Sequence, residues 1–213
     1  HAFAADNYQG TDHLIRNMKK LEVPFIAEIS RNSPVATIAE RLDAFARNSI
    51  TQSPWPDFEY RPAVDFAIGH GNDCIVLKYY VTEDIVQARY GKANEPVYKD
   101  SCVEFFLALG DEASYYNFEF NCIGACLAGY GAGRNGRQLL PDTVLEKIRY
   151  RLLLQKEKTA TDTVYWELTV QLPLDVFHFH RLTTLSGLCC RVNFYKCGDE
   201  LPQPHFLSWS PIE

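Results

Sequence analysis

The sequence predicts an all-β protein, a sandwich of antiparallel strands with two or three short helices. Several segments of the 213 residues are rich in β-branched and aromatic residues, which favour strands. Turn residues separate many of these segments, as at 69–73 and 131–136. Strands and helices do not alternate along the chain, which argues against a parallel α/β sheet.

The elements follow in order along the chain. Residues 1–20 are expected to form an N-terminal arm or extension, and residues 21–213 a single domain that begins with a strand at 25–29.

Ser33 is expected to cap a helix over 35–47, because Pro34 suits the first turn of a helix and apolar residues recur at helical spacing after it. Shorter helices or turns are expected at 141–148 and 174–177. The predicted strands are 64–68, 75–82, 101–109, 115–123, 125–130, 149–155, 164–172 and 190–196.

Composition limits the function. The chain has 27 acidic and 21 basic residues, a net charge of -6, and no basic cluster, so a nucleic-acid interface is not expected. No apolar run approaches the ~20 residues of a membrane span. The aromatic fraction is 13%, and aromatic side chains suit both strands and sugar-binding faces.

The seven cysteines indicate free thiols more than disulfides. Their number is odd, no CxxC motif occurs, and the residues around them alternate like strands, so most are expected to be buried. A reducing compartment and a cytoplasmic location follow as expectations, and a periplasmic or secreted location stays open. His178 and His180 lack a placed third ligand, so no metal or other cofactor is expected, with a structural calcium ion left open.

Strand parity predicts one polar sheet face. In the strand at 101–109, Val103, Phe105 and Leu107 share one side and Glu104 lies opposite. The strands at 115–123 and 190–196 repeat the pattern, with polar residues opposite the apolar ones. Lys78 and Arg191 are expected to pair with the acids of this face, and Trp166 is expected in the core. The face would suit a hydroxyl-rich ligand, although an ordinary solvated surface has the same pattern.

No catalytic motif is found. The glycines at 129–133 form GxGxG, but no parallel βαβ context surrounds them, so a loop is expected. Serines occur without the strand–turn–helix context of a nucleophile elbow. The chain is therefore not expected to be an enzyme.

Three stretches together resemble the family 9 carbohydrate-binding-module-like domains, in their bacterial stand-alone branch. They are NEPVYKDSCVEFF at 94–106, YYNFEFNCIG at 115–124, and RVNFYKCG at 191–198 followed by PHFLSWSP at 204–211. The resemblance implies a jelly-roll-like β-sandwich that binds mono- or oligosaccharides without catalysis. It also implies an association with carbohydrate catabolism and glycoside hydrolases.

The resemblance places the binding residues on the polar face, with aromatic rings that stack on the sugar. Protein-interaction or scaffold function is the alternative, and a haem or metal carrier is a further one. No nucleic-acid or membrane partner is expected. The candidate ligand-binding residues are Tyr98, Glu104, Asn117, Glu119, Asn121, Arg191, Asn193, Tyr195 and Trp209.

Overall fold

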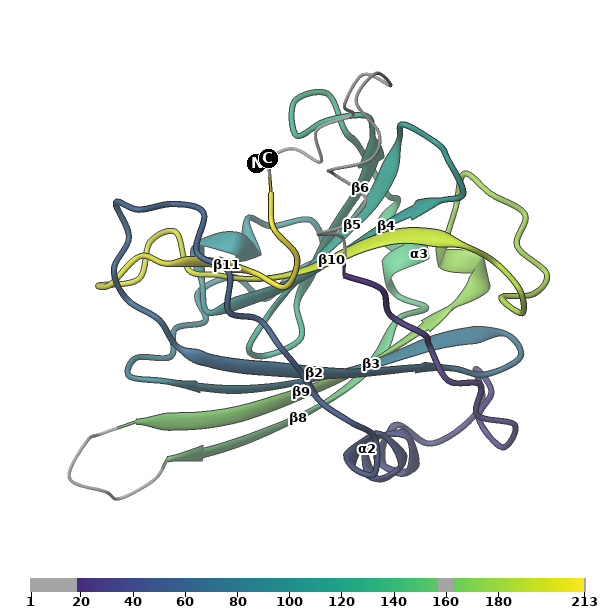
Figure 1. The fold of residues 1–213 in the computed structure, drawn as a ribbon, viewed down its shortest axis with the longest axis horizontal. Helices are drawn as coiled ribbons and strands as arrows, with labels where there is room; N and C mark the ends of the chain where they lie inside the picture. The colour runs from purple at the N-terminus through teal and green to yellow at the C-terminus, as the bar shows by residue number, and fades with distance from the viewer. Residues whose placement is uncertain (1–18, 157–162, 213) are drawn as a thin grey trace.

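A computed structural model describes residues 19–156 and 163–212. In this part of the chain the strands form two antiparallel sheets packed face to face, which confirms the predicted β-sandwich (Figure 1). The predicted arm at 1–20 lies outside the described residues except for its last two. Every helix in the described ranges falls short of the length and apolarity needed to cross a membrane.

The first sheet has five strands among the described residues, and a helix covers its outer face. The helix, α2 (Val35–Asp43), buries Ile38 and Leu42 against Ala67 and Val76 of the sheet. The strand order is β1 (Asn48–Ser49), β2 (Ala63–His70), β3 (Cys74–Glu83), β9 (Val164–Pro173) and β8 (Arg149–Lys156).

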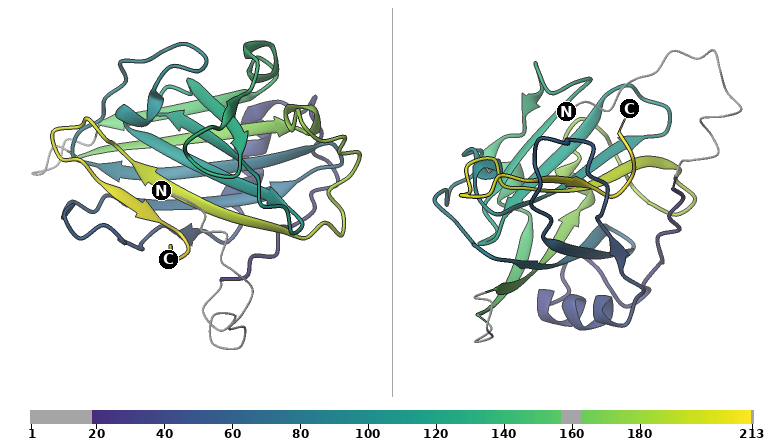
Figure 2. Two further views of the ribbon diagram at one scale, coloured as in Figure 1. Left: turned by 90° about the horizontal axis from the view of Figure 1, so that it is seen from above. Right: turned by 60° about the vertical axis from the view of Figure 1, so that its left-hand side comes forward.

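The second sheet has six strands in the described ranges, and Figure 2 (left) looks onto it from above. Short helical turns, η1 (Val97–Lys99), α3 (Asp142–Leu145) and η2 (Leu174–Val176), lie in the connections. The strand order is β11 (Phe206–Ser208), β10 (Cys190–Cys197), β4 (Cys102–Leu109), β5 (Tyr115–Asn121), β6 (Cys126–Gly131) and β7 (Gln138–Leu139).

Aromatic side chains fill the space between the sheets. Phe66 of the five-stranded sheet stacks on Phe194 of the six-stranded sheet, with ring centroids 3.7 Å apart. Phe194 in turn stacks on Phe105 of the neighbouring strand. Trp166 is fully buried, as its parity predicted. Burial of such rings is the largest stabilising contribution to a sandwich of this kind.

A buried ion-pair cluster joins the two sheets at one end of this core, and we call it the inner cluster: Glu83, Trp166, Lys196 and His205. The Lys196 Nζ lies 3.0 Å from Glu83 Oε2 and 2.8 Å from His205 Nε2, and it donates to the Cys197 carbonyl at 2.9 Å. Trp166 Nε1 donates to the other Glu83 oxygen at 2.7 Å. Burial, with the Lys196 charge beside it, lowers the pKa of His205 to about 3. His205 is therefore neutral and accepts a hydrogen bond from the ammonium group.

Three local expectations are wrong. Instead of a strand at 25–29, only Phe25 makes a bridge, to His70. The helix ends at Asp43, since Ala44 turns back onto its last carbonyls. Ser33 does not cap it, because the Ser33 hydroxyl accepts from the Ser30 amide instead.

Lys78 lies in the five-stranded sheet and cannot pair with the acids of the six-stranded one. Its Nζ is 2.6 Å from Asp43 Oδ1 of α2 and 2.7 Å from Glu167 Oε2 of β9. The sequence shows that Lys78 is on a polar face, but not which sheet that face belongs to.

Candidate functional site

A pocket of about 330 Å³ lies over the outer face of the six-stranded sheet. Its floor comes from β10, β4, β5 and β6, and its walls come from loops that rise beside them. Of its fourteen lining residues, eight are aromatic or aliphatic and five are charged. The lining residues are Trp55, Phe58, Tyr98, Glu104, Phe106, Glu119, Leu127, Gly129, Arg134, Arg137, Leu139, Tyr195, Asp199 and Phe206.

Two carboxyl groups form the centre of the floor. Glu104 of β4 and Glu119 of β5 are direct cross-strand partners, and Tyr195 of β10 faces Glu104 from the other side. Asn117, one pair further along β5, donates from Nδ2 to Glu104 Oε2 at 3.0 Å, and its Oδ1 accepts from Arg137 Nη1. Residues on alternate positions of adjacent strands thus share one face, as the parity predicted.

The floor disfavours negative charge. Burial, and then the neighbouring Glu104 carboxylate, raise the pKa of Glu119 well above its ordinary value, while Arg137 opposes them. The Glu119 Oε1 lies 3.8 Å from Arg137 Nη1, and Oε2 has no hydrogen-bond partner among the described residues. Burial and Glu104 likewise raise the pKa of Asp199 to about 6. Glu119 is therefore harder to ionise than an ordinary glutamate.

Aromatic rings form one wall of the pocket. The Trp55 ring meets Tyr195 at 6.0 Å and Phe206 at 5.6 Å between centroids. Phe106 packs against Tyr195 from the floor at 4.5 Å, and Phe58 contacts Phe206 at 4.6 Å. The wall joins the loop before β2 to strands β10, β4 and β11, so each ring is supported by at least one neighbour.

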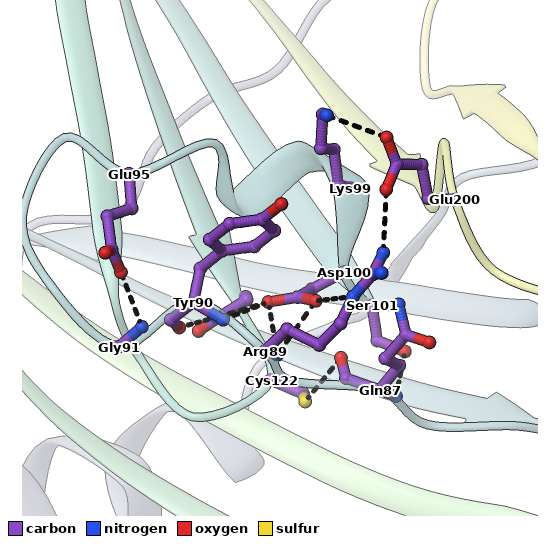
Figure 3. Close-up of polar contacts among 11 residues, drawn as sticks. Gln87, Arg89, Tyr90, Gly91, Glu95, Lys99, Asp100, Ser101, Cys122 and Glu200 are labelled. Carbon is purple, nitrogen blue, oxygen red and sulfur yellow. Dashed lines mark hydrogen bonds and ion pairs between the residues drawn. The ribbon is translucent and has the colours of Figure 1, made fainter.

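Another part of the rim is held by contacts between two loops (Figure 3). The Asp199 amide donates to the Tyr98 carbonyl at 3.1 Å, which fixes these two lining residues beside each other. Glu200 then accepts from Lys99 at 2.7 Å and from Arg89 at 2.9 Å (Figure 3). The rim is thus fastened by both main-chain and charged contacts.

Asp100 anchors the loop behind this rim (Figure 3). Its carboxylate is fully buried and accepts the main-chain amides of Arg89 and Tyr90 at 2.9–3.0 Å. It also accepts from Asn121 Nδ2 at 3.0 Å, and the same amide group donates to the Tyr90 carbonyl. A buried carboxylate with several donors stabilises the loop conformation that supports Tyr98.

Of the nine candidate residues from the sequence, Tyr98, Glu104, Glu119 and Tyr195 line the pocket. Asn117 lies directly behind the floor, between Glu104 and Arg137. The structure brings these five together, and their contact with a ligand stays a prediction.

The other four candidates lie elsewhere. Asn121 is engaged by the Asp100 anchor. Asn193 accepts from the Phe194 and Ser210 amides and holds the chain after β11. Arg191 donates to the Glu112 carbonyl near the far end of β10, so it does not pair with Glu104 or Glu119. Trp209 is buried between the sheets against Phe66 and Phe194, where no ligand in the pocket reaches it.

Several lining residues escaped the sequence-based prediction. Trp55 and Phe58 sit in the proline-containing loop before β2, and Arg134 and Arg137 in the glycine-rich loop after β6. Strand parity applies to neither loop. A usable hint was present at Trp55, since an aromatic residue between two prolines in a loop has no helix or strand face to pack on.

The described residues offer no evident metal site. Among residues 19–156 and 163–212, no three His, Cys, Asp or Glu side chains gather as ligands would. The ring of His180 lies between Tyr116, at 2.7 Å, and Glu112, at 3.0 Å, in a hydrogen-bonded chain. The cysteines are unlinked, and Cys189 and Cys190 are the two that are not buried.

Comparison with known proteins places the fold. The family model described as carbohydrate-binding family 9 matches residues 36–213. A protein from Bacteroides uniformis ATCC 8492, whose suggested function is carbohydrate binding, has a similar crystal structure. The TM-score is 0.80 with 33% identity, over 90% of this chain and 89% of the other.

Two more distant structures show the same fold. One is a family 9 carbohydrate-binding module from Caldicellulosiruptor kristjanssonii in complex with glucose, at TM-score 0.53 and 10% identity, over 90% of this chain and 85% of the other. The other is a family 9 module from that organism in complex with cellotriose, at TM-score 0.51 and 12% identity, over 88% and 84%. A search of the curated proteins finds no match.

Proposed function

The chain belongs to carbohydrate-binding family 9, and from this membership we propose that it binds carbohydrate, without catalysis, in the pocket over the six-stranded sheet. One observation supports the site most strongly: aromatic rings and hydrogen-bonding groups line the same hollow. A sugar ring has apolar C–H faces and a polar equator, so a site for it needs both kinds of group.

The two kinds of group lie on different surfaces of the pocket. The aromatic wall, with Trp55 and Tyr195, would pack against a face of the ring. The floor, with Glu104 and Glu119, would receive hydrogen bonds from the equatorial substituents. Tyr98, elsewhere in the lining, supplies a further ring, and the Asp199 amide holds its main-chain carbonyl.

The same geometry disfavours hydrolysis. Glycosidases place their two carboxyl groups on either side of the scissile bond. Glu104 and Glu119 instead lie side by side on neighbouring strands, on one face of the sheet. Both would approach a bound sugar from the same direction.

Calorimetric titration with glucose and cellotriose, the ligands of the two distant relatives, tests the proposal. We expect binding to the native chain, and a loss of about 1–2 kcal/mol, roughly 5- to 30-fold in Kd, for Trp55→Ala and for Tyr98→Ala. Tyr150→Ala is the matched control, because Tyr150 is 47% exposed on the five-stranded sheet. Equal affinity of all four proteins would remove the pocket from consideration. If no mono- or oligosaccharide binds at millimolar concentration, the function itself is wrong.

The cellular setting is part of the proposal. We expect a role in carbohydrate catabolism alongside glycoside hydrolases, in a reducing compartment such as the cytoplasm. Cys102 and Cys197 are cross-strand partners that remain unlinked, which agrees with a reducing setting. Fractionation of the source cells followed by thiol counting would test the location.

A further inference from the structure

The floor of the pocket has an excess of acid over base. Three carboxyl groups line it, from Glu104, Glu119 and Asp199, against two guanidinium groups, from Arg134 and Arg137. With every group ionised, the lining has a formal charge of one negative unit. A neutral ligand leaves that imbalance in a partly closed, low-dielectric site, where it costs most.

The central pair is unfavourable whenever both carboxyl groups are ionised. Like charges on directly opposed residues of two strands destabilise a sheet, and Glu104 and Glu119 are so opposed. Glu104 is 9% exposed and Glu119 is 7% exposed. Water therefore screens the repulsion poorly.

The nearby cations do not fully offset the repulsion between Glu104 and Glu119. Arg137 Nη1 donates to Asn117 Oδ1 and remains 3.8 Å from Glu119 Oε1. Its guanidinium also lies over the Tyr115 ring, 5.6 Å from the centroid. Arg134 is in an exposed stretch of the loop after β6. Glu119 Oε2 is buried and has no hydrogen-bond partner among the described residues.

We propose that the pocket selects amino sugars, carbohydrates with a protonated amine that is placed against the Glu104–Glu119 pair. This inference rests on the proposed carbohydrate-binding function and names the ligand class for the same site. A hydroxyl group donates a hydrogen bond to a carboxylate but supplies no charge, so ionising both Glu104 and Glu119 stays as costly as in the empty pocket. An ammonium group donates hydrogen bonds and also supplies the missing positive charge. The aromatic rings around it add a favourable cation–π contribution.

The proposal has a proton balance. In the empty pocket burial and the neighbouring Glu104 raise the pKa of Glu119 and so favour its protonated form. When the ammonium group enters, it favours the carboxylate form of Glu119, and the proton passes to the buffer. Glu104, Asp199, Arg134, Arg137 and Tyr195 are the other charged or titratable groups that line the pocket. Asp199 has an ordinary pKa of 3.8 raised to about 6, so at pH 7.5 it is mostly ionised and contributes little to the proton released.

Three trimers with one β-1,4-linked backbone separate the ligand classes: the trimers of glucosamine, N-acetylglucosamine and glucose. They differ only at C2, which bears an ammonium, an acetamido or a hydroxyl group. At pH 6.5 we expect the glucosamine trimer to bind at least fivefold more tightly than the other two. Titration at pH 7.5 in two buffers of different ionisation enthalpy should show net proton release for the glucosamine trimer only, after correction for the amine's own titration.

Two variants and a control test whether the Glu104–Glu119 pair causes the preference for the glucosamine trimer. Glu104→Gln and Glu119→Gln should each reduce the preference for the glucosamine trimer over the glucose trimer to within twofold of parity. The readout is the ratio of the two affinities in each variant, because both residues also line the site that receives the neutral sugar. Glu146→Gln, at an exposed position of the turn after α3, should leave this ratio unchanged.

The outcomes separate this inference from the proposed function. Equal or tighter binding of the glucose trimer overturns the amino-sugar preference and leaves carbohydrate binding in place. A preference that survives both Gln variants overturns the assignment to the Glu104–Glu119 pair. If none of the three trimers nor glucose binds, the proposed function fails and this inference fails with it.

Discussion

The inner cluster and the pocket floor both bury carboxyl groups, and they treat them in opposite ways. Glu83 has Lys196 at 3.0 Å and the Trp166 indole at 2.7 Å. Glu119 instead faces a second carboxyl group, and the Arg137 guanidinium lies 3.8 Å from its Oε1. One oxygen of each group, Oε2, has no hydrogen-bond partner among the described residues, but that of Glu83 lies against an ammonium group and that of Glu119 does not. A buried carboxyl group with a close counter-ion suits a structural role, and one beside a second carboxyl group in a pocket suits a ligand site. The difference favours a structural role for the first cluster and supports the proposed binding role of the second.

The largest expected effect comes from breaking the inner cluster. Glu83→Ala leaves the Lys196 ammonium buried without its counter-ion, which should lower the free energy of unfolding by about 3–5 kcal/mol. Chemical denaturation monitored by tryptophan fluorescence would measure it. The double variant Glu83→Leu/Lys196→Met removes both charges and should recover part of the loss. A single variant that costs less than about 1 kcal/mol would show that the pair is not a structural one.

A smaller loss of stability is expected from removing Arg137, the cation that contacts the floor. Arg137→Ala removes the donor to Asn117 and the positive charge near Glu119, and it should cost about 1.5–3 kcal/mol, the range for a hydrogen bond to a charged group. Urea titration would measure it, with Arg191→Ala, outside the pocket, as the matched control. Adding Glu119→Gln to Arg137→Ala should return part of the stability, because the like-charged pair is then gone. Strict additivity of the two changes would contradict the proposed coupling.

The smallest expected effect is a gain in stability from replacing Glu119. The ordinary pKa of Glu119 is 4.5, and the fold raises it. At a pH between the ordinary and the raised pKa, Glu119 is ionised in the unfolded chain and protonated in the folded chain. Stability from this group therefore falls as pH rises above the ordinary value. Glu119→Gln should stabilise the protein at pH 8 by about 0.2–1 kcal/mol, and the gain should vanish toward pH 4. Thermal melts across this range would show it, and a gain that grows at low pH would reverse the argument.

The sequence was sufficient for the strands because their alternation records which side is buried. Glu104 and Glu119 were predicted on the same face for that reason. The same rule would have placed Lys196 in the core, since it shares parity with Val192 and Phe194, but a lysine was not expected there. Its partner, Glu83, lies at the end of a strand in the other sheet, and no local pattern joins the two.

The loops set the limit of prediction. Trp55, Arg137 and Asp199 reach the pocket from three separate connections, and their meeting depends on the packing of the sheets beneath them. Trp209 shows the opposite failure: its position in a family-like stretch suggested a binding role, whereas its ring fills a space between Phe66 and Phe194. A motif match identifies a segment but does not tell which way its side chains point.

The Asp100 anchor has a thermodynamic consequence for ligand capture. Loops that must order on binding reduce affinity through lost conformational entropy. Here the buried carboxylate already fixes the backbone at Arg89 and Tyr90 (Figure 3), so the rim that bears Tyr98 is ordered before the sugar arrives. The pocket should therefore be preorganised for its ligand. We expect small ligands to bind without a large entropic cost from loop ordering, and without a slow closing step.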